Sequence, residues 1–208
     1  MTENLAGFAY DFVPGTGTRT LLLLHGTGGN EKSLINIARA LDPSARLLSP
    51  RGKVLENGMP RYFRRDERGV FDRNDLRLRT EELVQFIIEA SHIHSFDLLN
   101  LIGVVYSNGA NILSHLLFVH PEIAKAAVLL RPSSQSLPDS PDSYDLKKKA
   151  VFAAFGSRDE MTTEEDAQTF VSSLRSANAD LTYFTAPAGH GLTPGDIDEA
   201  RNWLQKLA

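Results

Sequence analysis

The segment 101–119 constrains the fold more than any other part of the chain. Its apolar start, Leu-Ile-Gly-Val-Val, is too short for a typical helix and is bounded by small and polar residues, so it predicts a fully buried strand. The run stops at Ser107-Asn108-Gly109, and apolar residues then recur at the spacing of a helix that packs on a core. A strand, a sharp turn with a serine and a helix are the context that a nucleophile elbow requires.

The elbow departs from its usual sequence at one position. The motif is normally G-x-S-x-G, but Val105 stands in place of the first glycine, whereas Gly109 is retained. An elbow serine has a strained backbone, and small flanking residues relieve crowding between the strand and the returning helix. We therefore expect Val105 either to hold the helix further out or to distort the elbow and weaken catalysis.

Buried strands alternate with amphipathic helices along the rest of the chain. Apolar runs predict strands at 6–13, 20–24, 46–49, 126–130, 151–155 and 181–185. Helices are predicted after Asn30, over 76–94, after the capping box Thr162-x-x-Glu165 and after Thr193-Pro194. This alternation predicts an α/β fold with a mostly parallel central sheet and helices on both faces. Residues 53–75 show no clear period, and a loop of that length is usually functional or mobile.

Residues that can act in catalysis follow the strands of this predicted sheet. The carboxyl ends of the strands are the place where parallel sheets bind ligands. Ser107 is the candidate nucleophile, His190 the base that accepts its proton, and Asp159 the group that orients the base. Two other roles stay open: Asp159 could cap the next helix, and Glu160 could be the acid. The backbone N–H groups of Thr27 and Asn108 are the candidate oxyanion donors.

Seven motifs resemble a known family: His25-Gly-Thr-Gly-Gly-Asn-Glu, Ser49-Pro-Arg-Gly, Met59-Pro-Arg-Tyr-Phe-Arg-Arg, Tyr106-Ser-Asn-Gly-Ala-Asn-Ile, Leu130-Arg-Pro, Gly156-Ser-Arg-Asp and Gly189-His-Gly-Leu-Thr. They resemble the small carboxylesterase and phospholipase-type serine hydrolases of the α/β-hydrolase superfamily, close to the dienelactone hydrolases. Within that family the chain is most similar to bacterial hydrolases associated with quinone-detoxifying dioxygenases. The resemblance implies an α/β-hydrolase fold without a large lid domain, and a carboxylesterase that forms an acyl-enzyme on small esters.

Several alternatives remain at this stage. The activity could instead be that of a thioesterase or a lysophospholipase, and Val105 leaves room for a binding or sensor protein that has lost turnover. Arg61, Tyr62 and Phe63, in the long loop, are candidates for the substrate pocket.

Length, charge and composition narrow the class of protein. A chain of 208 residues predicts a single domain spanning 1–208. The net charge of -4, without a long block of like charge, gives no reason to expect nucleic acid or a membrane as partner. The absence of cysteine excludes thiol nucleophiles and cysteine metal sites. We expect a cytoplasmic protein that acts on a small-molecule ester with no cofactor and no metal, and a homodimer stays open.

Overall fold

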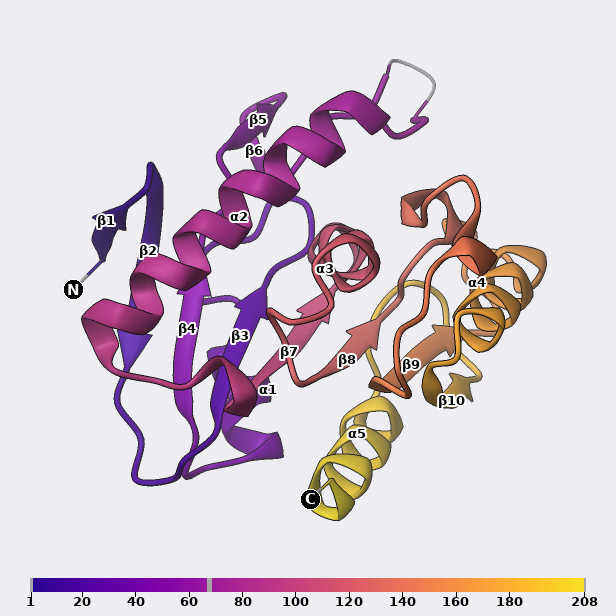
Figure 1. Cartoon of the computed structure of the whole chain (residues 1–208). Coiled ribbons are helices and arrows are strands. Elements are labelled where there is room, and N and C mark those ends of the chain that lie inside the picture. Colours follow the sequence, from indigo (N-terminus) through magenta and orange to yellow (C-terminus); the bar gives the residue numbers. More distant parts are fainter. Residues whose placement is uncertain (1, 67–68, 208) are drawn as a thin grey trace.

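A sheet of eight strands runs through the computed structural model, which describes residues 2–66 and 69–207 (Figure 1). In spatial order the strands are β1 (Glu3–Leu5), β2 (Phe8–Val13), β4 (Arg46–Pro50), β3 (Thr20–Leu24), β7 (Leu101–Tyr106), β8 (Ala126–Leu130), β9 (Ala150–Gly156) and β10 (Asp180–Ala186). The pairs β1–β2 and β2–β4 are antiparallel, and the ladder from β4 to β10 is parallel. The carboxyl ends of six strands therefore lie along one edge of the sheet.

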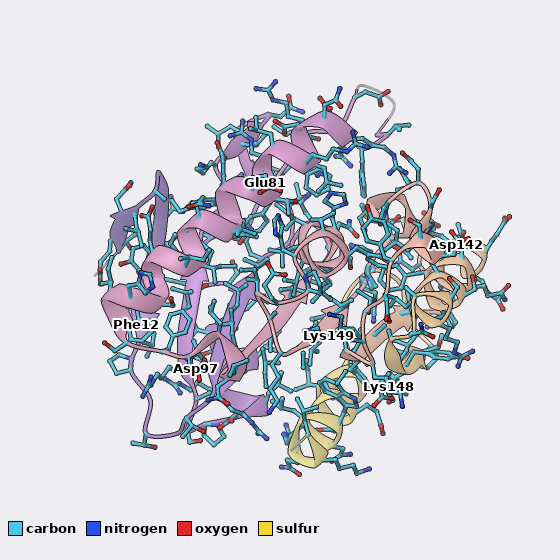
Figure 2. The ribbon with its side chains drawn as sticks, in the orientation of Figure 1. Phe12, Glu81, Asp97, Asp142, Lys148 and Lys149 are labelled. Carbon is cyan, nitrogen blue, oxygen red and sulfur yellow. The ribbon has the colours of Figure 1, made fainter. Side chains whose placement is uncertain are left out.

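Helices cover both faces of the sheet. The face with α2 (Arg73–His94), α3 (Asn108–Val119) and α4 (Glu164–Ser176) holds the larger apolar core, and α1 (Ile35–Leu41) and α5 (Pro194–Lys206) pack on the opposite face. Figure 2 shows the side chains that fill these layers. Central strands such as β3 are buried on both faces, which is why they appear in the sequence as unbroken apolar runs.

These layers confirm the predicted fold class, a mostly parallel sheet between helices, and no large lid is present over the strand ends in the described residues. The short helical elements in the described residues are three 3-10 turns, η1 (Leu98–Asn100), η2 (Ser134–Ser136) and η3 (Pro141–Ser143). Within 2–66 and 69–207, no helix is long and apolar enough to cross a membrane.

Two predicted helix starts are wrong. The helix predicted after Asn30 begins only at Ile35, because the Asn30 side chain accepts the backbone N–H of Lys32 in a local turn. The cap of α4 is Thr163 rather than Thr162, and its side chain accepts the N–H of Asp166. The start predicted at Thr193-Pro194 is confirmed, since Thr193 caps α5.

The segment 53–75 contains a hairpin that the sequence reading missed. Its strands, β5 (Val54–Glu56) and β6 (Met59–Arg61), pair antiparallel across Asn57-Gly58. Both turn residues have positive φ, 52° and 79°, which is the geometry that an Asn-Gly pair favours in a two-residue turn. The two strands are too short for an alternation of polar and apolar residues to be recognised in the sequence. The Asn57-Gly58 pair was therefore the signal that could have predicted the hairpin.

Candidate active site

Three predicted side chains meet at the carboxyl edge of the sheet. Ser107 follows β7 with φ 52° and ψ −115°, the strained conformation of an elbow. Its Oγ lies 2.8 Å from Nε2 of His190, and Nδ1 of that histidine lies 2.8 Å from Oδ2 of Asp159. The Asp159 side chain is fully buried, whereas that of His190 is 22% exposed. A continuous chain of hydrogen bonds therefore joins hydroxyl, imidazole and carboxylate.

Asp159 is the acid of this chain of contacts, and it also fixes its own turn. Its second oxygen, Oδ1, accepts the backbone N–H groups of Met161 at 2.9 Å and Thr162 at 3.2 Å. The neighbouring Glu160 is exposed. Of the two acids left open by the sequence, Asp159 is thus the one in contact with the imidazole.

Val105 was expected either to hold the helix further out or to distort the elbow, and with this valine in place Ser107 still has the positive φ of an elbow serine. Val105 is fully buried in the core shared with α3. The close approaches lie elsewhere: a Cβ on Gly103 would stand 2.1 Å from Cδ2 of Leu113, and one on Gly109 would stand 2.1 Å from the carbonyl oxygen of Leu24. Gly103 and Gly109 therefore relieve the crowding, and a valine at 105 is accommodated.

The two residues predicted to supply oxyanion donors, Thr27 and Asn108, line the same cavity as the serine. Thr27 lies in the loop after β3, and Asn108 is the first residue of α3, where an N–H has no partner inside the helix. Among the described residues, neither N–H donates to a protein acceptor. Because the N–H of Gly109 donates to the carbonyl of His25 at 3.0 Å, this loop and the elbow are tied together.

The β5–β6 hairpin and the residue after it bind the side chains of Thr27 and Asn108, the two residues that carry these donors. The guanidinium of Arg61, which is only 3% exposed, donates from Nη1 to Oγ1 of Thr27 at 2.7 Å and lies 3.0 Å from Glu56 through Nε. Burial lowers the pKa of Arg61, and Glu56 opposes that shift. Oδ1 of Asn108 accepts the backbone N–H of Tyr62 at 2.7 Å. Arg61 is thus a candidate to hold in place the loop after β3, which contains Thr27.

Of the three residues predicted for the substrate pocket, Arg61 lines the cavity and the two aromatics do not. Tyr62 and Phe63 are 2% and 0% exposed and pack in the core. The Tyr62 hydroxyl donates to the carbonyl of Pro50 at 2.7 Å and accepts the N–H of His25 at 3.2 Å. Burial of the apolar area of these two rings stabilises the hairpin, and the rings take no part in lining the cavity.

His25, the other histidine at a strand end, has a structural place. Its Nδ1 lies 2.6 Å from the carbonyl oxygen of Gly26, and its Nε2 accepts the N–H of Gly52 at 3.0 Å. Burial lowers the pKa of His25 more than the contact with that carbonyl raises it, which favours the neutral ring. Both ring nitrogens of His25 therefore have backbone partners, and neither is available to the hydroxyl of Ser107.

An ion pair that the sequence did not reveal holds the loop of His190. Arg131, at the end of β8, makes two bonds to the carboxylate of Asp196 at 2.8 and 2.9 Å, and both side chains are fully buried. The same guanidinium donates to the carbonyls of Gly189 at 3.3 Å and Gly191 at 3.0 Å, on either side of the histidine. Arg131 therefore clamps the backbone that presents the imidazole.

Asp196 is held in its charged form by these contacts. Burial raises its pKa, but the hydrogen bonds from Arg131 and Thr193 outweigh burial and leave the pKa below its usual value. The sequence offered two signals for the pair: an arginine directly after the buried strand 126–130, and an aspartate at the third position of the α5 capping box. Neither signal predicts that the two side chains form an ion pair.

The cavity beside the serine is small, and most of the residues that line it are of polar type. Its volume is about 180 Å³, and its lining comprises Thr27, Arg61, Arg65, Gly69, Phe71, Ser107, Asn108, Asn111, Arg131, Ser133, Gln135, Met161, Thr162 and His190. Among the described residues, no group of three or more histidine, aspartate or glutamate side chains is arranged to hold a metal ion. The site thus offers a hydroxyl, an imidazole and fixed N–H donors for chemistry.

Known proteins resemble the chain over most of its length, although no protein-family model matches it. A Bacillus subtilis (strain 168) protein named "Putative hydrolase MhqD" is 42% identical over 196 residues, which cover 92% of this chain and 95% of that protein. The structure of a Bacillus cereus carboxylesterase has a TM-score of 0.88 at 42% identity, over 94% of this chain and 92% of the other. A carboxylesterase from Mesorhizobium loti has a TM-score of 0.90 at 30% identity, over 98% and 96%.

Proposed function

The chain belongs to the α/β-hydrolase superfamily, among its dienelactone-hydrolase-like esterases, and on that premise we propose that it is a serine carboxylesterase of small esters. The observation that carries this proposal is the chain of contacts from Ser107 through His190 to Asp159. It opens onto a cavity that Thr27 and Asn108 also line, and the N–H groups of these two residues have no protein acceptor among the described residues. The relatives support an ester-hydrolysing enzyme, and the serine mechanism is our inference from this geometry.

The proposed reaction has two halves. Oγ of Ser107 attacks the ester carbonyl while Nε2 of His190 takes its proton, and the imidazolium then protonates the leaving alcohol. Asp159 accepts from Nδ1, which keeps Nε2 free as the acceptor and stabilises the positive ring. In the second half, water activated by the same imidazole releases the acid from the serine.

The oxyanion of each tetrahedral intermediate would be held by the backbone N–H groups of Thr27 and Asn108. A donor of this kind is typically worth about 2.7 to 4 kcal/mol in the transition state. Because both donors belong to the backbone, their positions depend on the loop contacts made by Arg61 and the elbow.

A fluorophosphonate probe tests the nucleophile directly. We expect the probe to add one covalent label to the wild-type protein, and peptide mass spectrometry to place that label on Ser107. The Ser107→Ala variant should take up no label and lose turnover of p-nitrophenyl acetate.

Ser133→Ala provides the matched control, because Ser133 lines the same cavity but does not contact the imidazole. It should still be labelled at Ser107. An unlabelled wild-type protein with a native circular dichroism spectrum would exclude the serine mechanism and favour the second candidate, a hydrolase fold that binds or senses a ligand without turnover.

The size of the cavity favours short acyl groups over those of a lysophospholipase. Its volume of about 180 Å³ lies below the roughly 300 Å³ at which sites for drug-sized ligands begin. We expect kcat/KM for p-nitrophenyl esters to fall by about tenfold or more between the butyrate and the decanoate. The reason is that methylene groups beyond the length of the cavity would clash with the residues that line it.

A series from acetate to decanoate measures this profile, and an acetyl thioester with a matched leaving-group pKa separates esterase from thioesterase preference. An optimum at eight carbons or longer would contradict the short-acyl proposal without affecting the assignment of the nucleophile.

A further inference from the structure

Asn111 lines the cavity of Ser107 from α3, one helical turn after the nucleophile. Its backbone N–H donates to the carbonyl of Ser107 at 2.9 Å, which fixes its place relative to the elbow. Only 6% of its surface is exposed, and neither the contacts of the triad nor the proposed oxyanion donors use its side chain. Burying an amide is unfavourable unless its hydrogen bonds are made, so the partners of this side chain matter.

The amide of Asn111 has a fixed orientation. Oδ1 accepts the backbone N–H of Ser133 at 2.8 Å, and only the oxygen of an amide can accept that bond. Among the described residues, Nδ2 donates to no protein acceptor. Nδ2 of Asn108 also lacks an acceptor, but that atom is fully enclosed by protein. Since Asn111 lines the cavity and its oxygen is turned toward Ser133, its Nδ2 is the donor that remains for a group bound in the cavity.

The cations that line the cavity are already paired with carboxylates. Arg61 and Arg65 lie 3.0 and 2.7 Å from oxygens of the same Glu56. Arg131 is paired with Asp196 at 2.8 Å. The buried side-chain donor that the cavity offers to a ligand is thus an uncharged amide. An amide N–H suits an uncharged acceptor such as a carbonyl, ether or hydroxyl oxygen.

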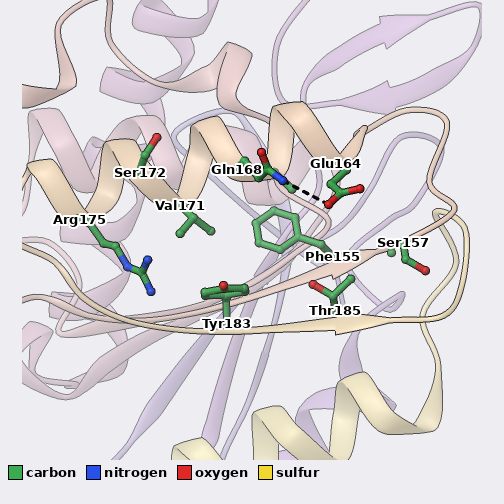
Figure 3. Close-up of a pocket in the computed structure, with 11 residues that line it drawn as sticks. Phe155, Ser157, Glu164, Gln168, Val171, Ser172, Arg175, Tyr183 and Thr185 are labelled. Carbon is green, nitrogen blue, oxygen red and sulfur yellow. Dashed lines mark hydrogen bonds between the residues drawn. The ribbon is translucent and has the colours of Figure 1, made fainter.

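A larger groove lies between α4 and β10, with Phe155, Val171 and Tyr183 among its lining residues (Figure 3). Its volume is about 630 Å³, but it shares no lining residue with the cavity of Ser107. A substrate held at Ser107 therefore meets the lining of the small cavity, and the contacts that select it come from residues such as Asn111.

We propose that Asn111 determines specificity, because its Nδ2 donates to a second, uncharged oxygen of the substrate besides the ester carbonyl. The preferred substrates are then small oxygenated esters, with an ether, keto or hydroxyl oxygen in the acyl or the alcohol part, rather than esters of plain hydrocarbon chains. This inference rests on the proposed esterase function, since it names the group that the same cavity selects. An acceptor oxygen completes the hydrogen bonds of the buried amide, whereas a methylene group in its place leaves the donor unpaired.

Two pairs of esters that differ only by an oxygen in place of a methylene group test the proposal. p-Nitrophenyl methoxyacetate and butyrate differ in the acyl part, and 2-methoxyethyl acetate and butyl acetate differ in the alcohol part. We divide each kcat/KM by the rate constant for hydrolysis by hydroxide, which removes the intrinsic effect of the oxygen on reactivity. We expect this normalised kcat/KM to favour the oxygenated ester of one pair by about tenfold.

Variants at Asn111 then show whether the amide causes the preference. Asn111→Leu removes the donor at similar volume and should abolish the preference. Asn111→Asp keeps an oxygen for the N–H of Ser133 but replaces the donor by an acceptor, so it should favour the hydrocarbon ester of the same pair. Gln135→Leu is the matched control, because Gln135 carries an exposed amide in the same cavity lining, and its loss should leave the ratio within about twofold.

Labelling of Ser107 by the fluorophosphonate probe shows that each variant is folded with a working nucleophile. Equal normalised rates within both pairs in the wild-type protein overturn the proposal, and so does a preference that both Asn111 variants retain. In either case turnover of the esters still supports the proposed esterase function. A wild-type protein that hydrolyses none of the four esters and takes up no label instead contradicts the esterase function itself, and the role of Asn111 falls with it.

Discussion

Replacing His190 by alanine is expected to lower kcat for p-nitrophenyl acetate by about 10⁴-fold or more, with little change in KM. The reason is geometric: Nε2 of this residue lies 2.8 Å from Oγ of Ser107, and nothing else within the described cavity lining can accept the proton of that hydroxyl at such a distance. Steady-state kinetics over a range of ester concentrations separates the two constants.

The controls for this prediction come from the other histidines and from a double variant. His92→Ala should behave as wild type, because His92 is an exposed residue of α2. Ser107→Ala and His190→Ala should not be additive, since the two side chains act as one unit. Retention of more than about a tenth of wild-type kcat by His190→Ala would remove this histidine from the role of base.

The meeting of Ser107, Asp159 and His190 could be predicted because each lies in the turn that follows a strand of the sheet. Ser107, Asp159 and His190 come after β7, β9 and β10, and a parallel sheet brings the carboxyl ends of its strands to one edge. Apolar runs in the sequence locate the strands, so they also locate the residues that follow. Distances along the chain of 52 and 31 residues between the members then matter little.

Val105 shows where a motif misleads. The motif places the small residue two positions before the serine, but the crowded point depends on where the helix crosses the strand. Residues 103 and 105 lie on the same side of β7, since side chains alternate along a strand, and the structure places the close contact with Leu113 at Gly103. The sequence contains this glycine, but only the helix crossing shows what it does.

Tyr62 and Phe63 were misjudged for a different reason. A long polar loop with aromatics resembles a pocket wall, but the hairpin folds its two rings under the loop, where both are buried. Burying aromatic area is favourable wherever the core has room for it. Arg61, the residue before Tyr62, keeps its guanidinium at the cavity because Thr27 and Glu56 give it partners there.

Arg131→Met is expected to lower kcat by about 10- to 100-fold while leaving KM nearly unchanged. The guanidinium touches the carbonyls on both sides of His190, so its loss frees the loop that aims the imidazole, and displacement by about 1 Å can cost two orders of magnitude in rate. The same change leaves the carboxylate of Asp196 buried without its cation, at a cost of about 3 to 5 kcal/mol of unfolding free energy. Kinetics and urea unfolding measure the two effects on the same protein.

A double variant separates positioning from stability. Arg131→Met with Asp196→Asn removes both charges, while the asparagine oxygen can still accept the Thr193 cap bond. The unfolding free energy should recover toward that of the wild type, because no unpaired charge remains. If Arg131 positions the histidine, kcat should stay low, since the carbonyls of Gly189 and Gly191 still lack their donor. Recovery of kcat along with stability would instead mean that the arginine serves only to neutralise Asp196.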